Sequence, residues 1–110
     1  MGKSAVARDP FSALGDPNRR AIVELLGQRG RSVQELADEL PISRPAVSRH
    51  LRLLKTAGLV SNTVNGTRRI YELDSRGVTA AQRYMSKVWG EAVARFLLVA
   101  ENTAPTRKRR

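Results

Sequence analysis

The segment SVQELADELPISRPAVSRHLRLLKTAGLV, residues 32–60, decides the fold of this chain. It begins with Ser32 and Glu35, whose spacing is that of a capping box and predicts the start of a helix. Apolar residues then recur at the i, i+3, i+4 and i+7 positions of one helix face: Val33, Leu36, Ala37 and Leu40. Pro41 ends this helix, so its connection to the next one is very short.

The second part of the segment predicts a helix that is apolar on one face and basic on the other. Ser43 can cap its start, Pro45 is tolerated in its first turn, and Gly58 can end it. The inward face carries Val47, Leu51 and Leu54, and the outward face carries Arg44, Pro45, Ser48, Arg49, Arg52 and Lys55. Two helices joined by a tight turn, the second with this character, predict a helix-turn-helix.

The sequence after this segment predicts a β-hairpin. Leu59–Val64 and Thr67–Leu73 are strand-like, and Asn65-Gly66 between them favours a type I′ turn. Tyr71 and Leu73 share one face suited to the core, whereas Arg68 and Arg69 stand close to the turn. A hairpin with basic residues near its tip, directly after a helix-turn-helix, has the arrangement of a wing.

The sequence before the segment predicts a loose arm and one more helix. Residues 1–9 form the expected flexible arm, and a short apolar turn follows around Phe11 and Leu14. Asp16 and Pro17 then have the types preferred at an N-cap and at the first helical position. The apolar stripe of this helix is Ala21, Ile22, Leu25 and Leu26.

The last helix is expected to start at residues 75–77 and to carry more apolar surface than one small domain can cover. Its apolar residues recur at threes and fours: Val78, Ala81, Met85, Val88, Trp89, Ala92, Val93 and Phe96. We therefore expect a second copy of the chain to pack on it. The residues expected at this dimer interface are Phe11, Leu14, Met85, Val88, Trp89, Ala92 and Phe96.

The predicted fold class is mainly α with a small β-hairpin, a winged helix-turn-helix that is dimeric through its terminal helices. A DNA-binding and dimerisation domain is expected over residues 10–100, between the arm and a tail. Residues 101–110 are polar and basic, and we expect this tail to be disordered.

The charge is concentrated. The 110 residues hold 20 Lys and Arg against 10 Asp and Glu, a net charge of +10. The stretch from Pro41 to Tyr71 contains basic residues and no acid, and residues 107–110 are all basic. A block without acids suggests a polyanion partner, most simply nucleic acid. A basic surface kept for solubility is the alternative.

The sequence excludes several functional classes and gives little support to others. The chain has no Cys and a single His, His50, so cysteine sites and a multi-histidine metal site within one chain cannot form. No phosphate-binding or dinucleotide-binding glycine motif occurs, so we expect neither an enzyme nor a cofactor. The sequence has neither an apolar run of membrane-spanning length nor a signal-peptide core, and a cytoplasmic protein is expected. We interpret His50 as a helix-packing residue with one hydrogen bond, and Trp89 as core or dimer interface rather than a ligand platform.

The segment of residues 32–60, followed by NGTRRIYEL (65–73) and preceded by FSALGDPNRRAIVELL (11–26), resembles the ArsR family of winged-helix transcriptional regulators. The resemblance implies a homodimer that binds an imperfect inverted repeat of double-stranded DNA, usually as a repressor released by a signal. The cysteines of metal-sensing members fall near Ser32 and Gln34 here, neither of which is a soft ligand. Other members bind zinc with His and Asp on the last helix, which here has no His. The DNA-binding part of the resemblance therefore carries over, and the metal-sensing part does not.

The residues expected to contact DNA differ in the part of the DNA that each is expected to reach. Arg44, Ser48 and Arg49 lie early on the second helix, where side chains reach base edges, although phosphate contact alone is the alternative for the two arginines. Arg52 and Lys55 are expected on phosphates or, alternatively, as plain solvated charge. The full predicted set is Ser43, Arg44, Pro45, Ser48, Arg49, Arg52, Lys55, Arg68 and Arg69.

Two roles in this set stay open. Ser43 can cap its helix, receive a phosphate at the helix N-terminus, or do both. Arg68 and Arg69 are candidates for the minor groove or its flanking phosphates, and cross-strand packing within the hairpin fits Arg69 better than Arg68.

The function expected from these features is a sequence-specific, dimeric DNA-binding regulator without metal control. We expect a repressor, and its own gene is a candidate target. An architectural, nucleoid-type protein that coats DNA with little sequence preference is the alternative, favoured somewhat by the basic tail. An unknown effector or partner protein bound by the last helix and the arm is compatible with the first interpretation. The sequence names neither the operator nor the signal.

Overall fold

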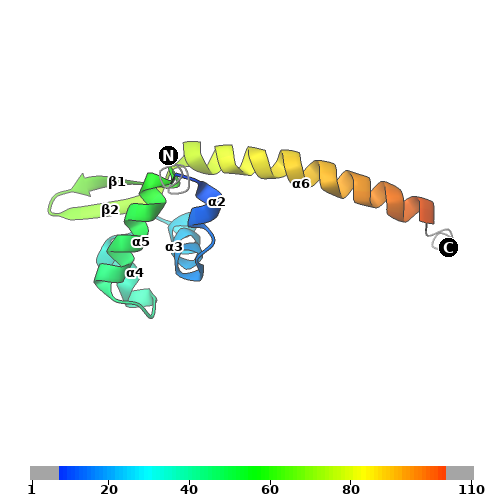
Figure 1. Cartoon of the computed structure of the whole chain (residues 1–110). Coiled ribbons are helices and arrows are strands. Elements are labelled where there is room, and N and C mark those ends of the chain that lie inside the picture. The colour runs from blue at the N-terminus through cyan, green and yellow to red at the C-terminus, as the bar shows by residue number, and fades with distance from the viewer. Residues whose placement is uncertain (1–7, 104–110) are drawn as a thin grey trace. The chain divides into compact units, whose positions relative to one another are not determined.

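A computed structural model describes residues 8–103. It has five helices and one hairpin in these residues (Figure 1): α2 Pro10–Ala13, α3 Pro17–Gln28, α4 Val33–Glu39, α5 Arg44–Thr56, β1 Val60–Asn65, β2 Arg68–Leu73 and α6 Ser75–Thr103. The predicted fold class, mainly helical with a two-stranded antiparallel hairpin, is confirmed. The chain divides into two compact units, one ending at Thr79 and one starting at Ala80, which are described separately. Among the described helices, none combines the length and apolar character needed to cross a bilayer.

The helix starts follow the capping residues of the sequence. The Asp16 carboxylate accepts hydrogen bonds from the backbone N–H groups of Asn18 at 2.8 Å and Arg19 at 3.1 Å. Ser32 and Glu35 form the predicted capping box, with N···O distances of 3.2 and 2.9 Å. Ser43 caps α5. These side chains satisfy backbone donors that a helix leaves without partners in its first turn, so each predicted start is confirmed.

One short helix was not predicted. Asp9 lies at the expected end of the loose arm, yet its carboxylate accepts a hydrogen bond from the backbone N–H of Phe11 at 3.1 Å and caps α2. The predicted apolar turn is thus a single helical turn. Residues 1–7 of the expected arm lie outside the described residues.

The core of the first unit lies between the helices and the hairpin. The inward-facing residues predicted for α5, Val47, Leu51 and Leu54, are fully buried. Tyr71 and Leu73 of β2 pack against the same core, as predicted from their shared face. The other buried apolar residues are Ala13, Ile22, Leu26, Leu36, Ala57, Leu59 and Val60.

The hairpin turn is one residue further along than predicted. Asn65 ends β1 and pairs with Arg68, so the two loop residues are Gly66 and Thr67. Of these two loop residues only Gly66 has a positive φ, 68°, whereas a type I′ turn needs a positive φ at both central positions. Glycine at the first loop position is the pattern of a type II′ turn, and the predicted type I′ turn at Asn65-Gly66 is wrong. The left-handed backbone fits glycine better than asparagine.

The hairpin is tied to the helices by a further backbone pairing. The N–H of Arg31 donates to the carbonyl of Tyr71 at 2.9 Å, and the N–H of Tyr71 donates to the carbonyl of Arg31 at 2.8 Å. Arg31 immediately precedes the capping box of α4. This bridge therefore fixes β2 against the start of the helix-turn-helix.

The start of α6 lies close to the end of α5. Gly77 sits against Gly58, and a Cβ placed on Gly77 would lie 1.8 Å from the Gly58 carbonyl oxygen. Asp74 helps to hold this corner, because its N–H donates to the carbonyl of Leu59 at 2.9 Å. Glycine at position 77 is thus required by space.

The second unit, from Ala80, consists of the remainder of α6 and exposes a series of large apolar side chains. Val88 is 45% exposed and Trp89 is 64% exposed. The other exposed apolar residues of this unit include Met85, Val93, Phe96, Leu97, Leu98 and Val99. The expected tail boundary after residue 100 falls inside α6, which continues to Thr103. Residues 104–110 lie outside the described part of the chain.

Candidate DNA-binding interface

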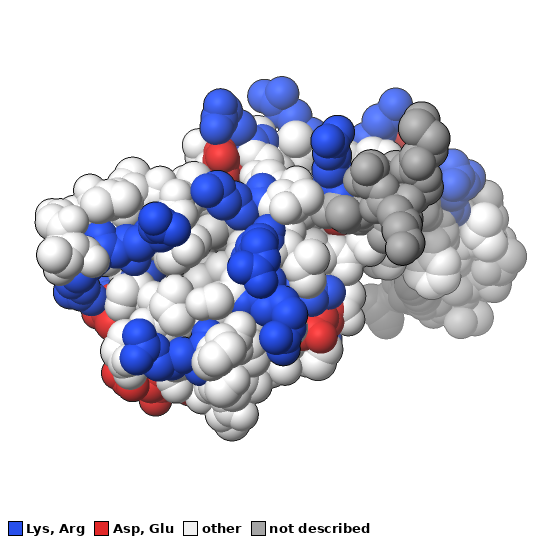
Figure 2. Space-filling view, turned by 60° about the vertical axis from the view of Figure 1, so that its left-hand side comes forward, with Lys and Arg blue, Asp and Glu red and all other residues white. Residues whose placement is uncertain are grey.

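The basic side chains of α5 lie on its exposed face. Arg44, Arg49, Arg52 and Lys55 are exposed, opposite the buried apolar face of the same helix. Figure 2 turns the hairpin side of Figure 1 forward and shows Lys and Arg side chains spread over that face, with few carboxylates between them. The amphipathic pattern predicted from the sequence is therefore present in the folded chain.

Most of these cations have no carboxylate partner. The ion pairs found within residues 8–103 involve Arg29, Arg31, Arg68 and Arg76. None of them involves the basic residues of α5 or Arg69 of β2. A surface with unpaired positive charge of this density attracts a polyanion.

The exposed face of α5 has a hollow on each side. One hollow lies toward α4 and is lined by Val33, Arg44, Pro45 and Ser48. It presents apolar surface beside a cation and a hydroxyl, which suits contact with base edges and a thymine methyl group. Three of its four residues belong to the predicted DNA-binding set, and Val33 is the addition.

The other hollow lies between α5 and the hairpin. Its lining residues are Ser48, Leu51, Arg52, Lys55, Asn62, Arg69 and Tyr71. The Lys55 ammonium donates to the side-chain amide oxygen of Asn62 at 3.5 Å across this hollow. Arg69 therefore lies on the side of the hairpin that faces α5, together with Arg52 and Lys55.

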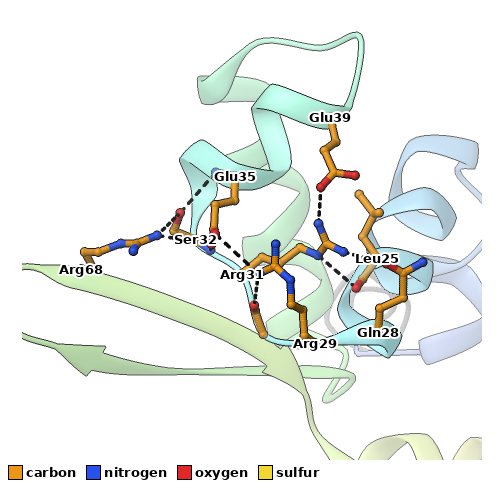
Figure 3. A network of polar contacts seen from close by, with 9 residues as sticks. Leu25, Gln28, Arg29, Arg31, Ser32, Glu35, Glu39 and Arg68 are labelled. Carbon is orange, nitrogen blue, oxygen red and sulfur yellow. Dashed lines mark hydrogen bonds and ion pairs between the residues drawn. The ribbon is translucent and has the colours of Figure 1, made fainter.

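Arg68 lies differently from its neighbour Arg69. Its guanidinium donates to the Ser32 hydroxyl at 3.2 Å and pairs with the Glu35 carboxylate at 3.3 Å (Figure 3). The sequence predicts that both arginines contact DNA, with cross-strand packing within the hairpin as an alternative that fits Arg69 better than Arg68. In the structure Arg68 contacts the start of α4, and Arg69 lies on the other side of the strand, because alternate residues of a strand point to opposite sides.

The Glu35 carboxylate is the centre of this contact. It accepts the backbone N–H of Ser32, and this hydrogen bond, together with the nearby charges of Arg29 and Arg68, holds the pKa of Glu35 below its ordinary range. Burial acts in the opposite direction and is outweighed. The ionised carboxylate therefore joins the start of α4 to the wing.

Arg31 is the most buried charged residue, 4% exposed. Its Nε donates to the carbonyl of Leu25 at 3.2 Å, its guanidinium donates to the Gln28 amide oxygen at 2.7 Å, and it forms an ion pair with Glu39 (Figure 3). These partners belong to α3 and α4, while its backbone pairs with β2. Arg31 thus joins the three elements that set the position of the wing, and it contributes no charge to the DNA-facing side.

Comparison with known proteins agrees with this architecture. A sequence profile described as a helix-turn-helix domain matches residues 14–61. The HTH-type transcriptional regulator Rv2034 of Mycobacterium tuberculosis is 48% identical over 86 residues, 78% of this chain and 80% of that protein. The HTH-type transcriptional repressor SmtB of the same species is 44% identical over 67 residues, 61% of this chain and 50% of that protein.

A solved structure covers almost the whole chain. An ArsR-like transcriptional regulator from Rhodococcus sp. RHA1 aligns with a TM-score of 0.71 and 28% identity, over 94% of this chain and 97% of that one. The chain belongs to the ArsR family of winged helix-turn-helix transcriptional regulators. It is a DNA-binding regulator and not an enzyme. The second helix of a helix-turn-helix is called the recognition helix, which is α5 in this chain, and the hairpin is called the wing.

Ser32 and Gln34, near which the resemblance places the cysteines of metal-sensing members, make hydrogen bonds within this fold. The Ser32 hydroxyl caps α4 and accepts the hydrogen bond from Arg68. The Gln34 amide donates to the Asp38 carboxylate at 2.6 Å within α4. Within residues 8–103, His, Asp and Glu side chains form no group of three that could hold a metal ion.

His50 of this ArsR protein packs between α5 and α3. It is half-buried, and its Nδ1 lies 3.3 Å from the Arg19 guanidinium of α3. Arg19 also donates to the carbonyl of Ala13 at 2.6 Å, so the pair connects α2, α3 and α5. The predicted packing role with one hydrogen bond is confirmed.

Sequence reasoning missed four residues of the interface region. Asn62 and Tyr71 line the hollow beside the wing, Val33 lines the hollow beside α4, and Arg31 fixes the wing. The strand alternation and a correct hairpin register would have placed Asn62 opposite Tyr71, as observed. Burial of Arg31 has no signal in the sequence, because its neighbours Arg29 and Arg68 have the same residue type and are exposed.

Proposed function

We propose that this ArsR-family chain is a homodimeric, sequence-specific repressor that binds an imperfect inverted repeat and is not controlled by metal. The observation that carries the proposal is the exposed face of α5, where basic and hydroxyl side chains have no carboxylate partner among residues 8–103. Such a face suits the major groove, which distinguishes all four base pairs. The name of the relative SmtB, a transcriptional repressor, supports the direction of regulation.

In this proposal each subunit places α5 in a major groove. Arg44, Ser48 and Arg49 contact base edges, with arginine able to pair bidentately with guanine O6 and N7. Ser43 and Pro45, at the N-terminus of α5, lie beside the DNA backbone in this arrangement. Two subunits then read half-sites separated by about one helical turn of DNA, or a multiple of it.

The dimer is supported by the apolar surface of α6. Its exposed residues include Met85, Val88, Trp89 and Phe96, which is more apolar surface than a monomer needs to leave in water. Phe11, 37% exposed, and the half-buried Leu14 complete the proposed interface, together with Ala92. Binding of two half-sites at once requires that the two subunits be held together.

A DNA-coating protein is the alternative, favoured by the four basic residues at positions 107–110. Competition separates the two functions. Footprinting on the promoter of the chain's own gene supplies a candidate operator, and its complex is then challenged with excess random duplex at fixed salt. A regulator retains its operator, whereas a coating protein is displaced in proportion to the competitor. Displacement in proportion would overturn the proposal.

An effector that releases DNA is also part of the proposal, and its chemistry is open. The exposed apolar residues of α6 can receive a partner protein once the dimer has formed, if part of the stripe remains uncovered. Small molecules and lysate proteins that lower operator affinity, with no effect on a variant lacking that surface, would identify such an effector.

A further inference from the structure

The hollow between α5 and the hairpin brings three cations together from two elements that are separate in sequence. Arg52 and Lys55 come from α5, and Arg69 comes from β2. Ser48, Asn62 and Tyr71 add neutral polar groups, and the buried Leu51 adds apolar surface. The lining contains no carboxylate, and the hollow has a volume of about 330 Å³.

Three like charges around one hollow repel one another, and an anion that lies among them offsets this repulsion by its attraction to all three. The folded chain does not supply that anion from residues 8–103, because none of the observed ion pairs involves these three side chains. Elsewhere in the same chain arginines are matched to carboxylates, as Arg68 is to Glu35 at 3.3 Å. The charge of the hollow is thus left for a ligand.

The donors of the hollow suit a phosphoryl group. Arginine presents a planar fork of N–H donors, lysine presents a compact ammonium, and hydroxyl and amide groups add neutral donors. Asn62 accepts from Lys55 through its carbonyl oxygen at 3.5 Å, which leaves its amide N–H₂ group to donate. A tetrahedral anion with several acceptor oxygens can use these donors together.

We propose that this hollow is a phosphoryl-binding site that takes one DNA backbone phosphate per subunit, held jointly by the recognition helix and the wing. The proposal rests on DNA binding by α5 but does not depend on sequence specificity. The proposal makes Asn62 and Tyr71 ligand-binding residues. It also means that Arg52, Lys55 and Arg69 bind the same phosphate and not three separate phosphates.

The two neighbouring arginines of the wing then have different roles, which provides a matched control. Arg69 belongs to the hollow, whereas Arg68 is held by Ser32 and Glu35 on the other side of the strand. Arg69→Gln and Arg68→Gln remove the same charge from adjacent positions. Both residues are exposed, so both variants should fold, which far-UV circular dichroism and thermal unfolding will check.

The first experiment uses inorganic phosphate. It is titrated at constant ionic strength, with chloride as the balancing anion, into the isotopically labelled chain and followed by NMR. We expect saturable shifts at Asn62, Arg69 and the end of α5, and their loss in Arg69→Gln but not in Arg68→Gln. Shifts that do not saturate, or that are equally large at Arg44 and Arg49, would overturn the proposal.

The second experiment uses a random duplex and tests whether the cations share one phosphate. Affinity is measured across a salt series for Arg52→Gln, Lys55→Gln, Arg69→Gln and the triple variant. Because each neutralised phosphate contributes about 0.9 to the salt slope, the triple variant should lose about 0.9 per subunit, and its fold-loss in affinity should be smaller than the product of the single losses. A slope loss of about 2.7 per subunit with multiplying losses, or no loss, would contradict the proposal.

The two experiments need no operator, so their failure is distinct from failure of the proposed function. Phosphate-induced shifts and non-additive losses of affinity in a chain that shows no operator preference would support the phosphoryl-binding site and contradict the proposed repressor. Operator preference without either of these results would support the regulator and contradict the phosphoryl-binding site.

Discussion

Arg49 is exposed on the early part of the recognition helix and has no carboxylate partner among the described residues. If it pairs bidentately with guanine, its loss should affect the operator and not random DNA. Arg49→Ala is expected to cost roughly 1–3 kcal/mol on the operator and much less on a random duplex. Equal losses of affinity on both duplexes would show that Arg49 contacts only phosphate. Contacts to base edges would then be expected from Arg44 and Ser48.

Lys55 is the control for this experiment because it lies in the last turn of α5, beside the wing. Lys55→Ala should weaken operator and random duplexes about equally, since a phosphate contact carries no sequence information. Its salt slope should fall by no more than about 0.9 per subunit. Filter-binding or fluorescence anisotropy over the same salt series measures both variants, and an operator-specific loss would contradict this role.

The close contact at Gly77 leads to a second prediction about a single residue. A Cβ at this position would lie 1.8 Å from the carbonyl oxygen of Gly58, a backbone atom that cannot rotate away. Gly77→Ala should therefore lower the free energy of unfolding by about 1–3 kcal/mol, although alanine is the better helix former. Gly90→Ala is the matched control, because nothing lies within 4 Å of its Cβ position, and it should stabilise or leave stability unchanged. Urea unfolding of both variants decides the matter.

Residue types and local spacing predicted the outward face of α5, its buried face and the caps. They could not assign partners across the fold. Arg31, Arg68 and Arg69 are all arginines, yet their surroundings differ. Arg31 is buried in a polar network, Arg68 is paired with Glu35, and Arg69 lines the hollow beside α5. Their differences depend on which elements pack together, and that information is non-local.

At the scale of elements, the charge on Glu35 joins α4 to the wing. Its pKa is lowered chiefly by the backbone hydrogen bond from Ser32, so the ionised form is favoured by folding. This contribution to stability is present at neutral pH and is lost as the pH falls below the ordinary range of a Glu carboxyl through the lower pKa of the folded state.

Glu35→Gln is the variant that tests this contribution. Glutamine can keep the capping box but cannot pair with Arg29 or Arg68. We expect a lower melting temperature than the parent chain at pH 7, and a difference that shrinks as the medium is acidified. Glu72→Gln controls for the loss of one negative charge, because Glu72 is exposed and forms none of the observed ion pairs. A difference that does not depend on pH would refute the assigned role of the charge.

The elements themselves were largely predictable because each carries its own start and stop signals. Asp16, Ser32 and Ser43 cap the helices that they were expected to cap. The hairpin turn was placed one residue early because Asn-Gly favours type I′, whereas the register that buries Val60 opposite Leu73 places Gly66 first in the loop. Packing of the hairpin on the core overrode the preference of the turn.

At the scale of the whole molecule, the proposal requires that metal ions leave DNA binding unchanged. Ser32 and Gln34 offer hard oxygen and amide groups that are already hydrogen-bonded, and the chain has no Cys. Zinc, nickel, cadmium and arsenite titrated against the protein–operator complex should not release DNA. Release at micromolar metal that a chelator reverses would contradict the proposal.

Dimerisation is the second property of the whole molecule, and α6 carries its test. Val88 and Trp89 are 45% and 64% exposed, and burying a large apolar side chain contributes about 1.5–3 kcal/mol. Charged residues at both positions should therefore weaken the dimer by at least about a hundredfold, because each change occurs twice in a symmetric pair.

The change is Val88→Glu with Trp89→Glu, and the control is Lys87→Glu. Lys87 is about half a turn from the stripe at 3.6 residues per turn, so the control alters charge without removing apolar contact. Analytical ultracentrifugation should give a monomer for the double variant and a dimer for the control. Affinity for an inverted repeat should fall with dimerisation, while affinity for a single half-site should stay unchanged, because each half-site needs one recognition helix and one wing. A folded dimer with unchanged affinity would show that the subunits meet elsewhere, and the apolar face of α6 would then be left for the partner protein.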